Sequence, residues 1–280
     1  MLFRSLDVMK ALLEAGADAD ARVKGHPWYM TYTGCGNGNC GLANVTGSTA
    51  FWRAAYGTDV EAMKLLAKYG ADPNIPTMAG GGGRGGGGGG GRAGGGRGGG
   101  GGGGGLDDPA PAPAGRGGPG GAAPPQAGGG GRGGPGGGAP GGGDPSGMPP
   151  TPAGGPGVYP LHAAAGAEYG EGFAGNAHRH APDSWLLSVK YLVEELGADV
   201  NGRDDGGYTP LHHAAARGDN EVILYLVSKG AEVKAVSRRG QTTADMANGP
   251  VSRISPYPET IALLVKLGAV NNNRCQSCVP

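Results

Sequence analysis

The four cysteines are the residues whose type and spacing could do chemistry, and they form two local pairs. Cys275 and Cys278 make a Cys-Gln-Ser-Cys motif near the C-terminus, a spacing typical of redox, haem or metal centres. Haem attachment needs a histidine directly after the second cysteine, and Val279 stands there. Reactive dithiols usually lie at a helix N-terminus, and too little chain follows Cys278 to form a helix. The motif therefore gives little support to a redox function.

Cys35 and Cys40 enclose a Gly-Asn-rich stretch and leave three alternatives open. The flexible spacer would let them form a small disulfide, which would imply an oxidising compartment. They could equally remain free thiols on a loop, or bind a metal. A four-cysteine zinc site is not expected because the two pairs belong to opposite ends of the chain. We expect no metal and no other cofactor.

Histidines and nucleophiles give no stronger signal for catalysis. His178 and His180 form a His-x-His pattern that can bind a metal, but a solvated loop pair is the more ordinary interpretation. No serine or cysteine has a base partner at a meaningful spacing, so nucleophilic catalysis has no support. The sequence therefore predicts a protein that is not an enzyme.

The secondary-structure elements that would position these residues belong to a sequence motif that recurs along the chain, called the repeated phrase below. Residues 207–233 read GYTPLHHAAARGDNEVILYLVSKGAEV, and similar phrases cover 47–73 and 157–201. Gly197 and Gly230 each open a Gly-Ala-acid signature and lie 33 residues apart. Self-similarity at this period indicates small helical units stacked side by side.

The residue types in the repeated phrase are explained by the turn and helix positions that they would occupy. Gly207 can supply the positive φ of a tight turn, Thr209 suits a helix N-cap, and Pro210 suits the first turn. Gly230 is placed to end the second helix in the left-handed conformation. The second helix carries an apolar stripe at Val222, Ile223, Leu226 and Val227.

These residues resemble the ankyrin repeat family, whose phrase is Thr-Pro-Leu-His-x-Ala-Ala followed by a second helix and Gly-Ala-Asp. Residues 209–215 match it closely, and residues 159–165 differ only at the cap. The unit from Gly47 has Ala50, Phe51 and Trp52 where Pro, Leu and His are usual. The resemblance implies that His162 and His212 are structural and bond between neighbouring repeats.

The predicted fold is an all-α solenoid of about four and a half helix-turn-helix repeats with β-hairpin or turn tips. The first repeat is only half present, as a second helix within residues 6–20. We assign residues 1–78 and 157–270 to repeats, with inserts at 25–45 and near 169–184, and 271–280 to a polar tail. Residues 79–156 are rich in Gly, Pro and Arg and are expected to be a disordered loop. We expect the repeats on its two sides to stack as one array.

The net charge and the hydropathy of the sequence limit the kinds of partner that we expect. The formal net charge is zero, and no apolar run approaches the roughly 18 residues of a membrane span. Arg-Gly-Gly triplets start at Arg84, Arg97, Arg116 and Arg132, but no aromatic residue accompanies them, so RNA contact is not favoured. We expect a monomer. We also expect Met1 to be internal or a late start, so the location is left open between cytoplasm and export.

The resemblance implies a non-catalytic scaffold that binds a protein partner through hairpin tips and the concave helix face. A redox subunit built on the C-terminal CxxC motif and a nucleic-acid tether built on the Arg-Gly loop remain alternatives. Register with the family selects these partner-facing residues: Ser48, Arg53, Tyr56, Asp205, Gly206, Tyr208, His213, Ala216, Arg217, Arg238, Arg239, Gln241 and Met246. Among them, Tyr208 and Arg217 are the expected anchors.

Overall fold

The computed structural model describes residues 5–25, 45–79, 144–167, 184–249 and 255–273. Within these ranges the regular structure is helical, with two isolated β-bridges and no strand. Both flanks of the Gly-rich run belong to one compact unit, and the second unit, residues 92–141, lies outside the described ranges. None of the helices in the described part is long and apolar enough to cross a membrane.

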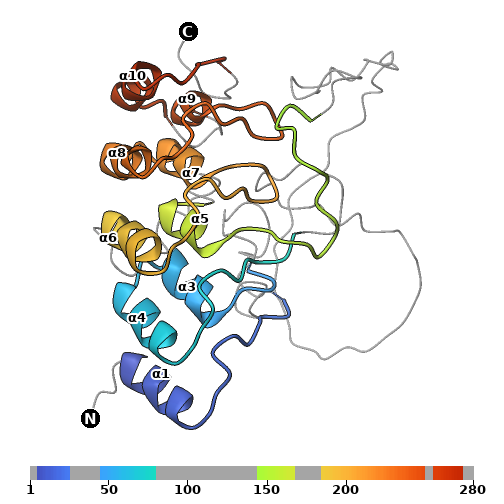
Figure 1. Ribbon diagram of the computed structural model, residues 1–280, viewed down its shortest axis with the longest axis vertical. Coiled ribbons are helices and arrows are strands. Elements are labelled where there is room, and N and C mark those ends of the chain that lie inside the picture. Colours follow the sequence, from blue (N-terminus) through green and yellow to red (C-terminus); the bar gives the residue numbers. More distant parts are fainter. Residues whose placement is uncertain (1–4, 26–44, 80–143, 168–183, 250–254, 274–280) are drawn as a thin grey trace, which may run out of the picture. The chain divides into compact units, whose positions relative to one another are not determined.

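The helices form an outer and an inner row (Figure 1). The outer row consists of α1 (Ser5–Glu14), α4 (Val60–Lys68), α6 (Trp185–Lys190) with its continuation η1 (Tyr191–Glu195), α8 (Asn220–Ser228) and α10 (Pro258–Lys266). The inner row consists of α3 (Ala50–Tyr56), α5 (Pro160–Ala165), α7 (Pro210–Ala216) and α9 (Thr243–Ala247). Successive inner helices pack on one another, as do α1 on α4 and α6 on α8. The described residues thus form half a repeat followed by four complete ones.

The core runs between the two rows because every repeat adds the same apolar positions. Leu211 on α7 and Ile223 and Leu226 on α8 are fully buried, and one cluster extends from α3 to α10. Alanines on the inner helices let neighbouring helices approach closely, so each repeat is covered by the next one.

The turn and cap residues behave as the sequence predicts. Thr209 is the N-cap of α7, with Pro210 in the first turn. Gly207 and Gly230 take positive φ angles of 77° and 92°. Gly218, which follows α7, also has a positive φ of 70°, whereas the equivalent position after α3 is Thr58 with φ 57°.

The outer helix of the third repeat contains one residue more than its counterparts. Just after α8 the amide of Ala231 donates to the carbonyl of Leu226, five residues earlier, whereas after η1 the amide of Ala198 donates to the carbonyl of Leu192, six residues earlier. The π-helical turn η1 absorbs this extra residue, as single π turns inside helices do. Leu192 therefore keeps its fully buried place in the core.

The repeats on either side of the Gly-rich run pack directly together through α3 and α5. Residues 77–79 pair with residues 154–158 by backbone hydrogen bonds, including Thr77 N to Val158 O at 3.0 Å and Ala79 N to Gly155 O at 2.8 Å. This short antiparallel pairing closes the neck from which the chain between them leaves the array.

One boundary differs from the prediction. Residues 144–156, assigned from composition to a disordered insertion, include described backbone that contacts the repeats. Contacts made by Asp144, Met148 and Pro156, rather than any difference in composition, separate this segment from the rest of the run. Several predicted features lie outside the described residues: Cys35, Cys40, Cys275, Cys278, His178, His180, most of the inserts at 25–45 and 169–184, and the Arg-Gly triplets.

Candidate interaction surface at the hairpin tips

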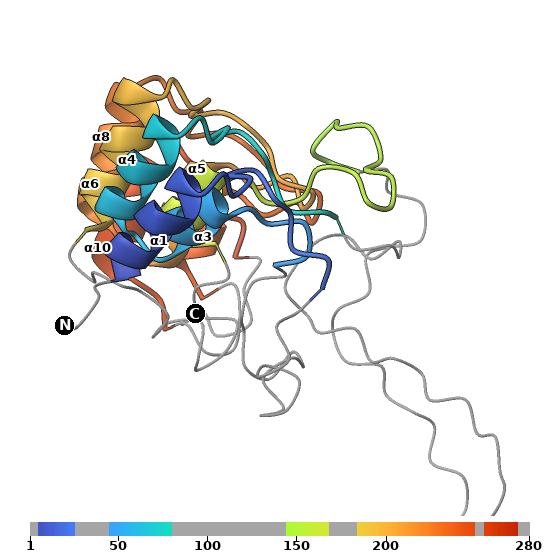
Figure 2. The same ribbon diagram turned by 90° about the horizontal axis from the view of Figure 1, so that it is seen from below.

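The connections from each outer helix to the next inner helix form hairpin tips that project away from the outer row (Figure 2). Met78, Asp205 and Arg238 occupy the same position on three of these tips, eight residues after the glycine that ends the preceding outer helix. Adjacent tips are joined by backbone, since Arg238 N donates to Gly206 O at 3.0 Å and Met78 N donates to Thr46 O at 2.8 Å. These bonds join the first tip to the second and the third tip to the fourth, and the row of tips is called the hairpin ridge below.

Two arginines hold the ridge together from equivalent positions. Arg203 Nη1 donates to the carbonyls of Gly207 and Val236, at 2.7 and 2.8 Å. Arg22 spans the first pair of tips in the same way, because its guanidinium donates to the carbonyls of Gly47 and Pro76. A guanidinium suits this role because its donors are fixed in one plane.

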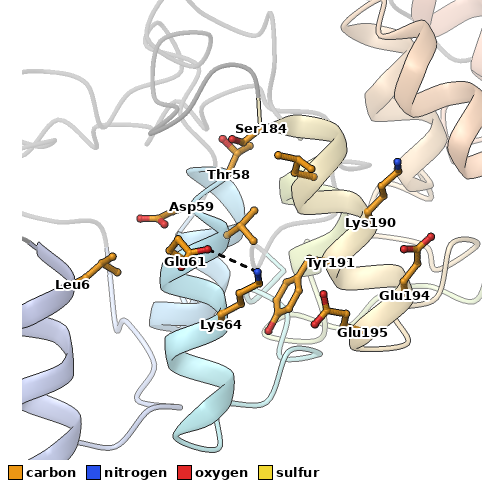
Figure 3. Close-up of a pocket in the computed structure, with 12 residues that line it drawn as sticks. Leu6, Thr58, Asp59, Glu61, Lys64, Ser184, Lys190, Tyr191, Glu194 and Glu195 are labelled. Carbon is orange, nitrogen blue, oxygen red and sulfur yellow. Dashed lines mark ion pairs between the residues drawn. The ribbon is translucent and has the colours of Figure 1, made fainter.

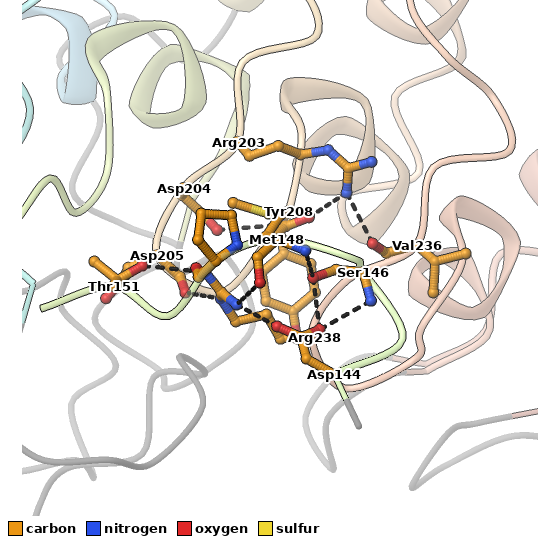
Figure 4. Close-up of polar contacts among 12 residues, drawn as sticks. Asp144, Ser146, Met148, Thr151, Arg203, Asp204, Asp205, Tyr208, Val236 and Arg238 are labelled. Atoms are coloured by element: carbon orange, nitrogen blue, oxygen red, sulfur yellow. Dashed lines mark hydrogen bonds and ion pairs between the residues drawn. The ribbon is translucent and has the colours of Figure 1, made fainter. Parts of the chain in front are cut away.

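Asp204 and Tyr208 of the third tip belong to a buried polar network (Figure 4). Asp204 accepts hydrogen bonds from Tyr208 N at 2.9 Å and lies 2.9 Å from His213 Nε2. Burial raises the pKa of Asp204, but the hydrogen bond and charge of His213 outweigh it, so the pKa lies below its usual value. Tyr208 in turn donates its hydroxyl proton to Gln241 Oε1 at 2.6 Å. The network fixes the tip rather than offering free polar groups.

The two histidines of the repeated phrase link neighbouring repeats, which confirms their structural role. His162 Nε2 lies 3.0 and 3.1 Å from the carbonyls of Gly202 and Tyr208, and His212 Nε2 lies 3.3 Å from the carbonyl of Gln241. Because a carbonyl only accepts, each Nε2 carries the proton. Burial lowers the pKa of His162 to about 4 and that of His212 to about 3, so both rings are neutral.

The predicted partner-facing residues divide into two groups. Those that the structure buries are Ser48, Tyr56, Gly206, Tyr208, His213, Ala216, Gln241 and Met246. The expectation that His213 faces outward is therefore wrong, because it packs on Asp204. Arg53, Asp205, Arg217 and Arg238 are intermediate in exposure, and Arg239 is exposed.

Arg217, one of the expected anchors, makes contacts within the array. Its guanidinium lies 3.4 Å from the ring centre of Trp185 at the start of α6 and forms an ion pair with Asp219 at 2.5 Å. Its side chain is 5% exposed. Arg217 thus covers the junction of the third and fourth repeats, and Tyr208 contacts a different set of residues.

Arg238 has a partner that the sequence did not indicate. Its guanidinium forms an ion pair with Asp144 and donates to the backbone oxygens of Met148 and Pro149 (Figure 4). Burial raises the pKa of Asp144, but hydrogen bonds from Ser146 and the hydrogen bond and charge of Arg238 outweigh it, so the pKa is lowered overall. The carboxylate is accordingly ionised at neutral pH.

A second feature is an open groove of about 510 Å³ on the outer row, between α4 and α6 (Figure 3). Leu6 of α1 and Leu187 of α6 contribute apolar surface, and Leu187 is 60% exposed. Lys64 pairs with Glu61 at 3.8 Å and lies 5.8 Å from the centre of the Tyr191 ring.

The described residues contain no group of three or more His, Cys, Asp or Glu side chains that could hold a metal ion. Sequence reasoning missed Arg22, Arg203, Asp204 and Asp144. A signal existed for the arginines, since each lies six residues after the glycine of a Gly-Ala-Asp phrase. Asp144 has no such signal, because its partner is distant in sequence.

The paired helices, left-handed glycines and histidine bridges define a helical repeat solenoid. Comparison with known proteins gives its family: residues 177–227 match the family described as ankyrin repeats in many copies. The chain therefore contains ankyrin repeats.

Curated relatives agree over short stretches. Human protein phosphatase 1 regulatory subunit 27 is 41% identical over 61 residues, which is 22% of this chain and 39% of the relative. Human ankyrin repeat domain-containing protein 49 is 42% identical over 52 residues, 19% of this chain and 22% of the relative. Mouse protein phosphatase 1 regulatory subunit 12A is 36% identical over 74 residues, 26% of this chain and 7% of the relative. The matched stretches thus span well under half of these relatives.

Proposed function

We propose that the protein is a non-catalytic scaffold that binds another protein through the hairpin ridge and the adjoining inner helices. The observation that supports this most is the ridge, whose tips are bonded in pairs and present Asp205 and Arg239, while Arg53 lies on the adjoining inner helix α3. A rigid array of side chains drawn from several repeats offers a partner surface without any reaction centre.

The relatives point the same way. Two of them are named as regulatory subunits of protein phosphatase 1, and such a name describes a protein that works through another protein. The redox and nucleic-acid alternatives rest on Cys275, Cys278 and the Arg-Gly triplets, which lie outside the described residues, so they stay predictions from the sequence.

Site-specific photocrosslinking tests the proposal. A photoreactive amino acid at Arg239 or Arg53 should crosslink a protein from the source cell, whereas one at Leu224, which is 50% exposed on the outer helix α8, should not. Crosslinks that form from Leu224 and not from Arg239 or Arg53 would contradict the proposed surface.

A further inference from the structure

Arg238 is held in place by hydrogen bonds to the neighbouring tip of the ridge. Its backbone N–H donates to Gly206 O at 3.0 Å, and its Nε donates to Asp205 O at 2.9 Å. The side chain is only 11% exposed. These bonds to the neighbouring tip fix the position of the guanidinium and leave both Nη groups for other acceptors.

Both Nη groups donate to one non-helical segment, residues 144–151. Nη1 takes the Asp144 carboxylate and the Met148 carbonyl, the latter at 3.3 Å. Nη2 takes the Pro149 carbonyl at 2.5 Å and Thr151 Oγ1 at 3.2 Å. A carboxylate and two backbone carbonyls are groups that many peptides can present to a guanidinium fork.

The segment has the properties of a peptide ligand. None of its residues is helical, and Asp144 accepts hydrogen bonds from the amide and hydroxyl of Ser146, which form a local turn. Prolines limit the freedom that docking removes. A Cβ atom on Gly207 would lie 3.4 Å from the Met148 sulfur, so this side chain lies close against the tip backbone.

We propose that the Arg238 tip is a binding site for a non-helical, proline-containing peptide with a carboxylate, and that residues 144–151 occupy it as an intramolecular stand-in for such a partner. This rests on the proposed function, since it names one site on the ridge and the chemistry of its partner. The pairing of residues 154–156 with Met78 and Ala79 tethers the segment beside Arg238 and gives it a high effective concentration. A partner must therefore displace it.

Competition with a synthetic peptide tests this. A fluorescent, N-acetylated peptide with the sequence of residues 144–153 is titrated into the full chain and followed by anisotropy. Asp144→Ala weakens the internal competitor, so this variant should bind the peptide at least about tenfold more tightly than the unchanged chain. Adding Arg238→Gln should abolish the gain, whereas Arg239→Gln, a matched charge loss on the same tip, should preserve it.

Helical circular dichroism and urea unfolding show whether each variant is folded, and Arg238→Lys serves in place of the glutamine variant if that one is not. A peptide with Asn in place of its Asp should bind the Asp144→Ala chain about tenfold more weakly. Equal affinity for the unchanged chain and Asp144→Ala, or a gain that survives loss of the Arg238 guanidinium, would overturn the proposal. A dimer of the unchanged chain that Asp144→Ala abolishes would overturn the intramolecular assignment. The crosslinking test above is independent of these results.

Discussion

The indole Nε1 of Trp52 donates a hydrogen bond of 2.8 Å to the backbone oxygen of Val158, which lies 106 residues further along the chain. In the next two repeats His162 and His212 make the same bond, to the carbonyl at the position equivalent to Val158. Trp52 therefore replaces the histidine that the other repeats have at this position, and its hydrogen bond joins residues on opposite sides of the Gly-rich run. This bond couples the second repeat to the third.

Trp52→Phe should destabilise the array by about 1–3 kcal/mol, because the buried carbonyl of Val158 loses its donor and some volume is lost. Urea unfolding measures the change. Tyr69→Phe is the control, since the hydroxyl of Tyr69 meets Glu14 at 3.3 Å on the exposed surface and should contribute less than about 0.5 kcal/mol. Equal losses for the two variants would show that the indole bond has no special role.

Replacing residues 80–143 by a shorter Gly-Ser linker should leave a single cooperative unfolding transition, because the contacts between α3 and α5 involve other residues. Each halving of the connection should add about 0.6 kcal/mol, since a shorter loop loses less entropy on closure. Calorimetry or urea unfolding checks both points. Two separate transitions would mean that the two sides of the run do not support each other.

Thr58→Gly should stabilise the protein by about 1 kcal/mol, because a β-branched residue is strained at φ 57° and glycine is not. The reciprocal change, Gly218→Ala, should be destabilising, since its φ is 70° and a Cβ there would lie 2.6 Å from the ring of Tyr257. Thermal unfolding of the pair gives the comparison. A loss of stability in Thr58→Gly would mean that the contacts of the threonine outweigh its backbone strain.

Stability should fall as the pH is lowered from about 6.5 towards 4. In the unfolded chain His162 and His212 take up protons near pH 6.5, whereas in the folded protein their pKa values are about 4 and 3. The unfolded state thus binds more protons in this window, at a cost of up to about 1.4 kcal/mol per pH unit for each ring. His212→Gln should reduce the slope by about that amount in urea unfolding followed against pH. An unchanged slope would place the titration elsewhere.

The fold could be predicted because its signals are local. Thr209, Pro210 and Gly230 specify a cap, a first turn and a helix end within one repeat, and the structure shows all three. The π turn of the third repeat also has a local signal, because this repeat has one residue more before Gly197 than the other repeats have before the equivalent glycine. The number of helix pairs followed from counting such phrases.

The surface was harder to predict because it depends on contacts between distant residues. Tyr208 and His213 stand at positions that the family presents to partners, yet here they are buried by bonds to Gln241 and Asp204. Nothing local sets Asp144 apart within a run of Gly and Pro. Its contact becomes visible only when the tip carrying Arg238 is placed beside it.

The neck formed by residues 77–79 and 154–158 has a practical consequence. An inserted sequence of any length that starts and ends at this neck stays attached beside the hairpin ridge, while the packing of the helices is unchanged. The same junction is thus a natural splice point for a foreign module, such as a reporter or a second binding domain, carried next to whatever the array holds. Such a module would meet a captured molecule at the elevated local concentration of a short tether.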